Sequence, residues 1–196
     1  MAVQESKLLG PDSSSSLDPT LEIPGYKPKR QDRVGAVNRG EGLLFYIKED
    51  VRFQELSSAE ENELEVHTIR VQLRRKDWVR ISNVYLPSSS TQETRLNPAL
   101  IPSGPDSIIM GDLNVHSSLW DNVKPTDPRG IEVEDWLLDQ DLFCVNDRPP
   151  TLTVKNNGSD STHDLTLVEA RWESKCILKV EESIKACNHH SITTAV

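Results

Sequence analysis

The segment from Ser107 to Asn122, SIIMGDLNVHSSLWDN, joins a short apolar run to a series of polar side chains. The run Ile108–Met110 is typical of a buried strand. A glycine ends it, and Asp112, Asn114 and His116 then follow at alternate positions. Because alternate residues of an extended segment share one face, these three side chains are expected to project together from the end of a rigid strand. An Asx-rich turn that ends the strand is an alternative interpretation of the same residues.

The length and composition are those of one folded domain, spanning residues 1–196. Apolar residues make up 36% of the chain and charged residues 27%, which suits a globular protein rather than a disordered one. A net charge of −9 is the wrong sign for a DNA-binding module that relies on a basic face, but an enzyme that gathers carboxylates around a divalent cation tolerates it. Two basic stretches, residues 27–39 and 70–80, either contact phosphates or are ordinary solvated surface.

Cysteine usage and hydropathy favour an intracellular protein. The three cysteines are odd in number and have no CxxC spacing, which disfavours a disulfide framework and a structural zinc site. The first residues contain no apolar stretch typical of a secretory signal. The longest apolar run, Leu43–Ile47, is far shorter than the roughly 20 residues that cross a bilayer, so no membrane association is expected.

Strand signals dominate the chain. The runs that predict strands are Gly42–Lys48, Leu64–Leu73, Trp78–Leu86 and Ser107–Gly111, followed by shorter runs at 142–146, 151–154, 163–168, 176–180 and 190–196. Apolar and polar residues alternate in Leu64–Leu73 with one slip, which indicates a bulge. The RRKD sequence that follows suits a hairpin turn.

Helix signals are few. Asp127 is a suitable N-cap, and Pro128 a suitable first residue, for a helix through IEVEDWLLDQ, which carries an apolar stripe. A weaker helical signal covers Gln92–Leu100, and a Ser- and Pro-rich stretch over residues 10–33 predicts a loop. Many strands at hairpin spacing with few helices predict an α+β fold, in which two packed, mainly antiparallel sheets carry helices on the outside.

Five short motifs occur in order along the chain. They are Gln4-Glu5-Ser6, Asn83–Pro87, Gly111–Asn114 followed by His116 and Trp120, Thr162–Leu167, and Cys187–Ile192. Their order and spacing resemble the QE[TS], NVYxP, GDxNxHxxxW, xxDLTL and SDHxxI motifs of the endonuclease/exonuclease/phosphatase superfamily, which has the deoxyribonuclease-I-like fold. The chain is most similar to the apurinic-type endonuclease domain of non-LTR retrotransposons, and the resemblance covers nearly its whole length.

The resemblance implies a fold, a reaction and a cofactor. The fold is a four-layer α/β/β/α sandwich, and the reaction is hydrolysis of a phosphodiester bond that nicks one strand of DNA. The cofactor is Mg²⁺, with Mn²⁺ as an alternative. The protein would hold DNA at its phosphate backbone and act in the nucleus. The nicked end would prime DNA synthesis by a reverse transcriptase domain of the parent element. This sequence does not contain that domain.

The resemblance also implies roles for individual residues. The expected catalytic residues are Asp112, which deprotonates the attacking water, Asn114 and Tyr85, which donate to the phosphate, and His189, which contacts the scissile phosphate and is oriented by Asp164. The expected metal ligands are Glu5 and Asn188, and the expected substrate-binding residues are Asn114, His116 and Arg95. Taken singly, each has a structural explanation as well, such as a strand-end acid, a core tyrosine or a surface histidine. The ordered set favours the catalytic explanation.

The sequence departs from the family pattern in two respects. The family domain begins with an earlier strand and helix, and this sequence starts at the next strand, so we expect a sandwich that lacks both and folds poorly by itself. Asn188 stands where the family has an aspartate, and the lost negative charge is expected to weaken metal binding or activity about 10- to 100-fold. Two alternatives therefore stay open: a catalytically impaired remnant of the domain, and a phosphoesterase of the same superfamily with another substrate.

Overall fold

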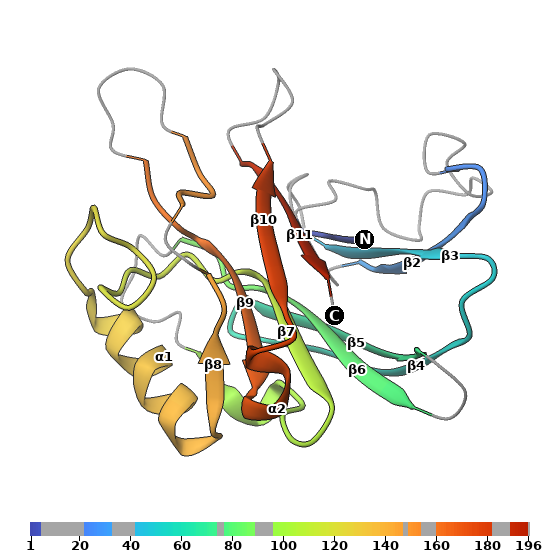
Figure 1. Ribbon diagram of the computed structural model, residues 1–196, viewed down its shortest axis with the longest axis horizontal. Coiled ribbons are helices and arrows are strands. Elements are labelled where there is room, and N and C mark those ends of the chain that lie inside the picture. The colour runs from blue at the N-terminus through green and yellow to red at the C-terminus, as the bar shows by residue number, and fades with distance from the viewer. Residues whose placement is uncertain are drawn as a thin grey trace.

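The computed structural model describes residues 1–4, 22–32, 42–73, 77–88, 96–146, 149–153, 160–181 and 189–195 (Figure 1). Its largest unit is a six-stranded sheet with the strand order β4-β5-β6-β7-β9-β8. These strands are β4 (Phe53–Glu61), β5 (Leu64–Gln72), β6 (Trp78–Tyr85), β7 (Ser107–Asp112), β9 (Asp164–Glu169) and β8 (Leu142–Cys144). Neighbouring strands are antiparallel, except that β6 and β7 are parallel.

A three-stranded antiparallel sheet packs on one face of the larger sheet. Its order is β1-β3-β2, and its strands are β1 (Ala2–Val3), β3 (Leu43–Lys48) and β2 (Tyr26–Gln31). Asn83 of β6 donates its side-chain N–H groups to the carbonyls of Val3 and Leu44, at 3.0 and 3.4 Å. Glu65 of β5 accepts from the backbone N–H of Gly42 at 3.0 Å. These polar bonds join the two sheets, which confirms the predicted sandwich.

Helix α1 (Pro128–Asp139) covers the opposite face of the large sheet, alongside β8 (Figure 1). Its N-cap is Asp127, as predicted, and the side chain of Asp127 accepts from the N–H of Gly130 at 2.6 Å. The buried stripe of the helix packs with alternate residues of the sheet; this cluster includes Val133, Trp136, Leu137, Ile109, Leu165 and Leu167. The side chains between them, such as Ile108 and Val168, pack instead with β3 on the other face.

The remaining elements lie near the end of the chain and beside the sheet. Strands β10 (Ile177–Glu181) and β11 (Ser191–Ala195) form an antiparallel pair. The hydroxyls of Thr194 on β11 and Thr166 on β9 are 3.4 Å apart, so β11 lies against the large sheet. A short helix, α2 (Ala170–Glu173), follows β9. None of the helices in the described part of the chain has the length and apolar character that a membrane span requires.

Three predicted elements differ from the structure. Residues 26–31, expected in a loop, form strand β2, and the rest of the 10–33 stretch lies mostly outside the described residues. The helical signal near residue 100 corresponds to a single 3-10 turn over Pro98–Leu100, capped by Asn97. Of the run at 151–154, the described residues 151–153 contribute two isolated bridges, both at Leu152. Strand β4 was not predicted, because most of its residues are exposed and several are charged or polar.

The irregularity expected in Leu64–Leu73 lies in the partner strand. The register between β4 and β5 shifts at Leu56, which is the extra residue between Glu55 and Ser57. The six residues Leu64–Ile69 are all buried, because β5 has the three-stranded sheet on one face and the α1 core on the other. The slip in the sequence pattern therefore reflects burial on both faces rather than a bulge in β5.

Candidate active site

Strand pairing brings two carboxylates together at one end of the large sheet. Asp112 is the last residue of β7 and Asp164 the first of β9, and the two are direct partners in the antiparallel ladder. Opposite residues of antiparallel strands project from the same face, so their side chains are neighbours. By the alternation along β7 and β9, this is the face that carries the three-stranded sheet. The two aspartates therefore lie between the sheets, at the edge of the sandwich.

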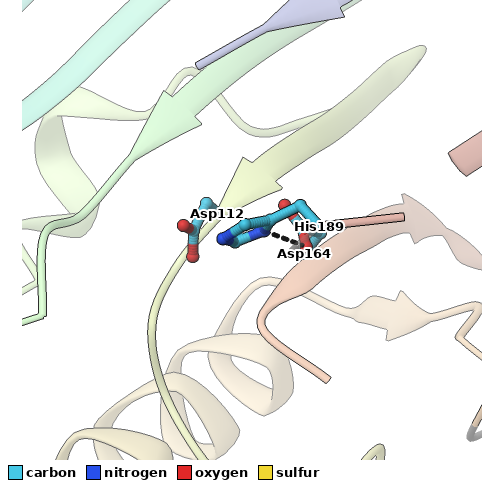
Figure 2. Close-up of side chains that lie close together, drawn as sticks. All are labelled: Asp112, Asp164 and His189. Carbon is cyan, nitrogen blue, oxygen red and sulfur yellow. Dashed lines mark hydrogen bonds and ion pairs between the residues drawn. The ribbon is translucent and has the colours of Figure 1, made fainter. Parts of the chain in front are cut away.

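His189 completes a group of three side chains (Figure 2). Its Nδ1 is 3.0 Å from Oδ2 of Asp164. Figure 2 shows the ring between the two carboxylates, with its second nitrogen turned toward Asp112. The backbone of His189 is held by a bridge to Leu152, which also bridges Ser161, just before Asp164. One ligand atom from each of the three side chains lies within 4.8 Å of the others.

The environment of Asp112 makes its carboxyl group a weak acid. Only 6% of the residue is exposed. Burial is the main reason that the pKa of Asp112 is raised from 3.8 to about 7, and the charge of Asp164 raises it further. His189 and the N–H of Asn114 act in the opposite direction. A carboxyl group with a pKa near 7 is divided between its two forms at neutral pH, so Asp112 is suited to accept a proton from a bound water.

The glycine of the GDLN motif permits the close approach of β6 and β7. Gly111 has a φ of 154°, and a Cβ placed on it would lie 1.8 Å from the carbonyl oxygen of Val84. The next pair in this parallel register is Tyr85 and Asp112. Tyr85 is therefore beside Asp112 at the strand ends, and only 5% of it is exposed. A side chain at residue 111 would separate the two strands at the point where the site is built.

Asn114 lies in a turn and, at the same time, beside the carboxylates. Its φ is 46°, a left-handed conformation that asparagine tolerates, and its N–H donates to Oδ1 of Asp112 at 3.0 Å. Its side-chain NH₂ donates to the carbonyl of Leu86 at 3.1 Å, and its Oδ1 is 2.9 Å from Nδ1 of His163. The turn and catalytic interpretations of this motif are thus compatible, because the turn is what brings Asn114 back toward Asp112.

His116 belongs to a second histidine–carboxylate pair. Its Nδ1 is 3.3 Å from Oδ2 of Asp121, and its ring meets that of His163 edge-on, with centroids 4.8 Å apart. Asp121 is 2% exposed and also accepts from three backbone N–H groups, those of Val123, Lys124 and Thr162. These hydrogen bonds hold the pKa of Asp121 below its usual range in spite of its burial. The pair fixes the 116–127 loop to the segment that precedes Asp164.

The donor set suits a hard divalent cation. Mg²⁺ prefers oxygen ligands and needs few carboxylates, because it keeps several of its waters. Asp112 and Asp164 supply such oxygens at neighbouring positions, and Asp164 also orients His189. A cation bound by Asp112 and Asp164 would relieve the burial cost and the repulsion that raise the pKa of Asp112. The residues present therefore fit the ion that the family resemblance implies.

The structure places six of the nine predicted site residues. The structure brings together Asp112, Asp164 and His189. Beside Asp112 lie Asn114 and Tyr85. The ring of His116 does not join this group and packs against the ring of His163. The other three, Glu5, Arg95 and Asn188, lie outside the described residues, and their roles stay predictions. The nearest described neighbour of Glu5 in sequence is Gln4, whose side chain donates to Oδ1 of Asn83 at 2.5 Å.

Three residues near the site were missed in the sequence. They are Asp121, His163 and Arg129. Arg129 of α1 donates to the carbonyls of Pro87 and Leu113, at 3.1 and 3.4 Å, and so ties the ends of β6 and β7 together. His163 and Arg129 act through contacts to distant segments, and Asp121 joins its own loop to Thr162; local patterns do not encode these contacts. The one available signal was the position of His163 directly before Asp164.

Comparison with known proteins agrees with this geometry. A family model described as endonuclease-reverse transcriptase matches residues 79–193, which is more than half of the chain. Among solved structures, the chain is similar to the endonuclease domain of TRAS1, a telomere-specific non-LTR retrotransposon, with 14% identity and a TM-score of 0.64 over 89% of this chain and 81% of that one. No match was found among curated proteins.

The two matches have different weight. At 14% identity, the structural likeness concerns the fold, and it confirms the expected sandwich of two sheets. The family model covers four of the five sequence motifs completely, those at 83–87, 111–120, 162–167 and 187–192, and it supports the predicted resemblance to the endonuclease/exonuclease/phosphatase superfamily. The chain therefore belongs to the endonuclease–reverse transcriptase family.

Proposed function

We propose that the protein is a Mg²⁺-dependent endonuclease that hydrolyses a phosphodiester bond and nicks one strand of DNA. The observation that carries the proposal is the convergence of Asp112, Asp164 and His189 at the strand ends, within 4.8 Å of one another. Family membership supports the reaction class. A bound Mg²⁺ would supply polarisation of a phosphoryl oxygen.

Each residue of the site has a distinct task in this proposal. Asp112 takes the proton of the attacking water, a role for which its buried position at the end of β7, fixed by the N–H of Asn114, is suited. Asp164 accepts the Nδ1 hydrogen of His189 and orients the ring. In the doubly protonated form of His189 the other ring nitrogen also carries a hydrogen, which it donates to the phosphate to stabilise its developing charge. Asn114 donates to the same phosphate without adding negative charge to a site that already contains two carboxylates.

DNA is the proposed substrate, held mainly through its phosphates. The protein has a net charge of −9, so binding must depend on local basic residues. Some of these are already engaged: Lys29 pairs with Glu55, and the guanidinium of Arg70 contacts Gln54 and lies over the ring of Trp78. The affinity for DNA should therefore fall as the salt concentration rises. The fall should be smaller than for a strongly basic protein, because fewer basic residues contact phosphates.

A plasmid assay tests the proposal. Purified protein with Mg²⁺ should convert supercoiled DNA to the open circular form, and a chelator should abolish the conversion. Asp112→Ala and His189→Ala should remove the activity, whereas Asp135→Asn, on the exposed side of α1, should retain it. Nicking that survives Asp112→Ala or the chelator would contradict the proposal.

The second candidate is a catalytically impaired form of the same domain. The observation that favours it is Asn188, which stands where the resembling family has an aspartate. In this case wild-type protein should nick weakly or not at all, and Asn188→Asp should raise the rate by about 10- to 100-fold. An unchanged rate in Asn188→Asp would exclude Asn188 as the cause of low activity.

A further inference from the structure

The side-chain amide of Asn114 is anchored at both of its polar atoms. Its Nδ2 is 3.1 Å from the carbonyl oxygen of Leu86, and its Oδ1 is 2.9 Å from Nδ1 of His163. A backbone carbonyl can only accept, so the NH₂ group must face Leu86 and the amide oxygen must face the histidine. The orientation of the amide is thus determined by the chemistry of its neighbours.

The same reasoning assigns the proton of His163. The amide oxygen of Asn114 only accepts, so Nδ1 of His163 carries the hydrogen that joins them. Nε2 of His163 is buried and has no hydrogen-bond partner among the described residues. A hydrogen on Nε2 would be an unsatisfied buried donor, which is costly. The hydrogen on Nδ1 is therefore the one that joins His163 to the amide of Asn114.

The histidine is itself held in place. Its backbone N–H donates to Oγ1 of Thr151 at 3.0 Å, and its ring rests edge-on against His116. His116 is in turn paired with the buried side chain of Asp121. The ring of His163 therefore has a rigid support, which makes it an effective anchor for the amide.

We infer that His163 is a positioning residue that turns only the N–H side of Asn114 toward the substrate phosphate. The inference rests on the proposed function, in which Asn114 contacts that phosphate. Each NH₂ group has two hydrogens, and the bond to Leu86 uses one of them. With Oδ1 occupied by His163, the second N–H is what remains for a ligand. The site then presents a donor to an anion, and never the amide oxygen, which would repel it.

Loss of the anchor should affect catalysis more than binding. Removing one neutral hydrogen bond that orients a transition-state donor should lower kcat by about five- to tenfold. KM should change less than about twofold, because the phosphate backbone contacts that hold DNA do not involve His163. A role confined to packing would instead reduce the amount of folded protein and leave kcat per folded molecule unchanged.

The experiment combines kinetics with a spectroscopic measurement. His163→Leu removes the donor, and His163→Gln keeps a donor and should restore most of kcat. In an Asn114→Ala background, His163→Leu should have no further effect on kcat, because the anchor has nothing left to orient. Nitrogen-15 NMR of the metal-free wild-type protein should show a hydrogen on Nδ1 of His163.

Either arm can overturn the inference. A His163 ring without a hydrogen on Nδ1 would refute the assigned network, and an equal loss of kcat with and without Asn114 would refute action through the amide. If wild-type protein nicks no DNA with any divalent cation, the proposed function fails, and the NMR measurement alone then decides whether the amide is oriented as inferred.

Discussion

Replacing Asp112 by asparagine should stabilise the metal-free protein at alkaline pH and have little effect near pH 4. The carboxyl group has a pKa of about 7 in the folded protein, against an ordinary value of 3.8. A raised pKa means that the folded state binds the proton more tightly than the unfolded state. The stability that this tighter proton binding by Asp112 contributes is fully present below pH 3.8 and is lost as the pH rises to about 7.

The magnitude follows from the two pKa values. The difference between about 7 and 3.8 is about 3 units, and each unit corresponds to about 1.36 kcal/mol, so ionised Asp112 costs about 4 kcal/mol. Asparagine avoids this cost, and its side-chain oxygen still accepts the N–H of Asn114. Since about 1 kcal/mol shifts Tm by roughly 2–4 °C in a chain of this size, the variant should melt about 10 °C above the wild type at pH 8.

The assay is thermal or urea unfolding of both proteins in chelator, at intervals from pH 4.5 to 8.5. The quantity of interest is the difference between the two, in which the titration of every other group cancels. Asp135→Asn serves as the control and should show no pH-dependent difference. Adding Mg²⁺ should stabilise the wild type more than the variant. A difference that is constant across pH, or an asparagine variant less stable at pH 8, would refute the reasoning.

Three further predictions concern folding. Gly111→Ala should cost about 3 kcal/mol or more in urea unfolding, because the new Cβ would lie 1.8 Å from the carbonyl oxygen of Val84; a loss below about 1 kcal/mol would show that the strands can separate freely. Burial lowers the pKa of His67 below 6.5, so the contribution of this histidine to stability is present above pH 6.5 and is lost as the pH falls. The His67→Leu variant should therefore become more stable relative to the wild type between pH 7 and pH 5. A difference between the two that does not change with pH would contradict this. Asp127→Ala should cost about 1–2 kcal/mol, because it removes the cap on the N–H of Gly130, and an unchanged urea midpoint would count against the cap.

The parts of the fold that the sequence predicts are those with strong local signals. Strand β7 is a short apolar run, and α1 has an N-cap, a first-turn proline and an apolar stripe. Strand β4 lacks such a signal, because it is an exposed edge strand whose side chains do not alternate between core and solvent. Strand β2 was hidden by its lysines and proline, which are compatible with a strand that pairs on one side.

The site divides in a similar way. Order and spacing of the motifs identify Asp112, Asp164 and His189, but their proximity comes from the register of β7 and β9, which no local pattern fixes. His163 and Asp121 were missed because they act across the chain, on Asn114 and on the backbone N–H of Thr162 respectively. His163 was predicted as the first residue of a strand, but strand β9 begins at Asp164, so the alternation rule does not give the direction of the His163 side chain.

The pairing of β7 with β9 also has a kinetic consequence. Helix α1 and strand β8 lie between them in the sequence, so their contacts close a long loop. Such non-local pairing raises the contact order and slows the search for the native topology. Because the two aspartates meet only when this loop has closed, a newly made chain cannot form the proposed ion site before that step. Binding of a divalent ion would then distinguish fully folded molecules from partly folded ones. A chain cut between β7 and β9 should bind the ion again only when its two fragments reassociate.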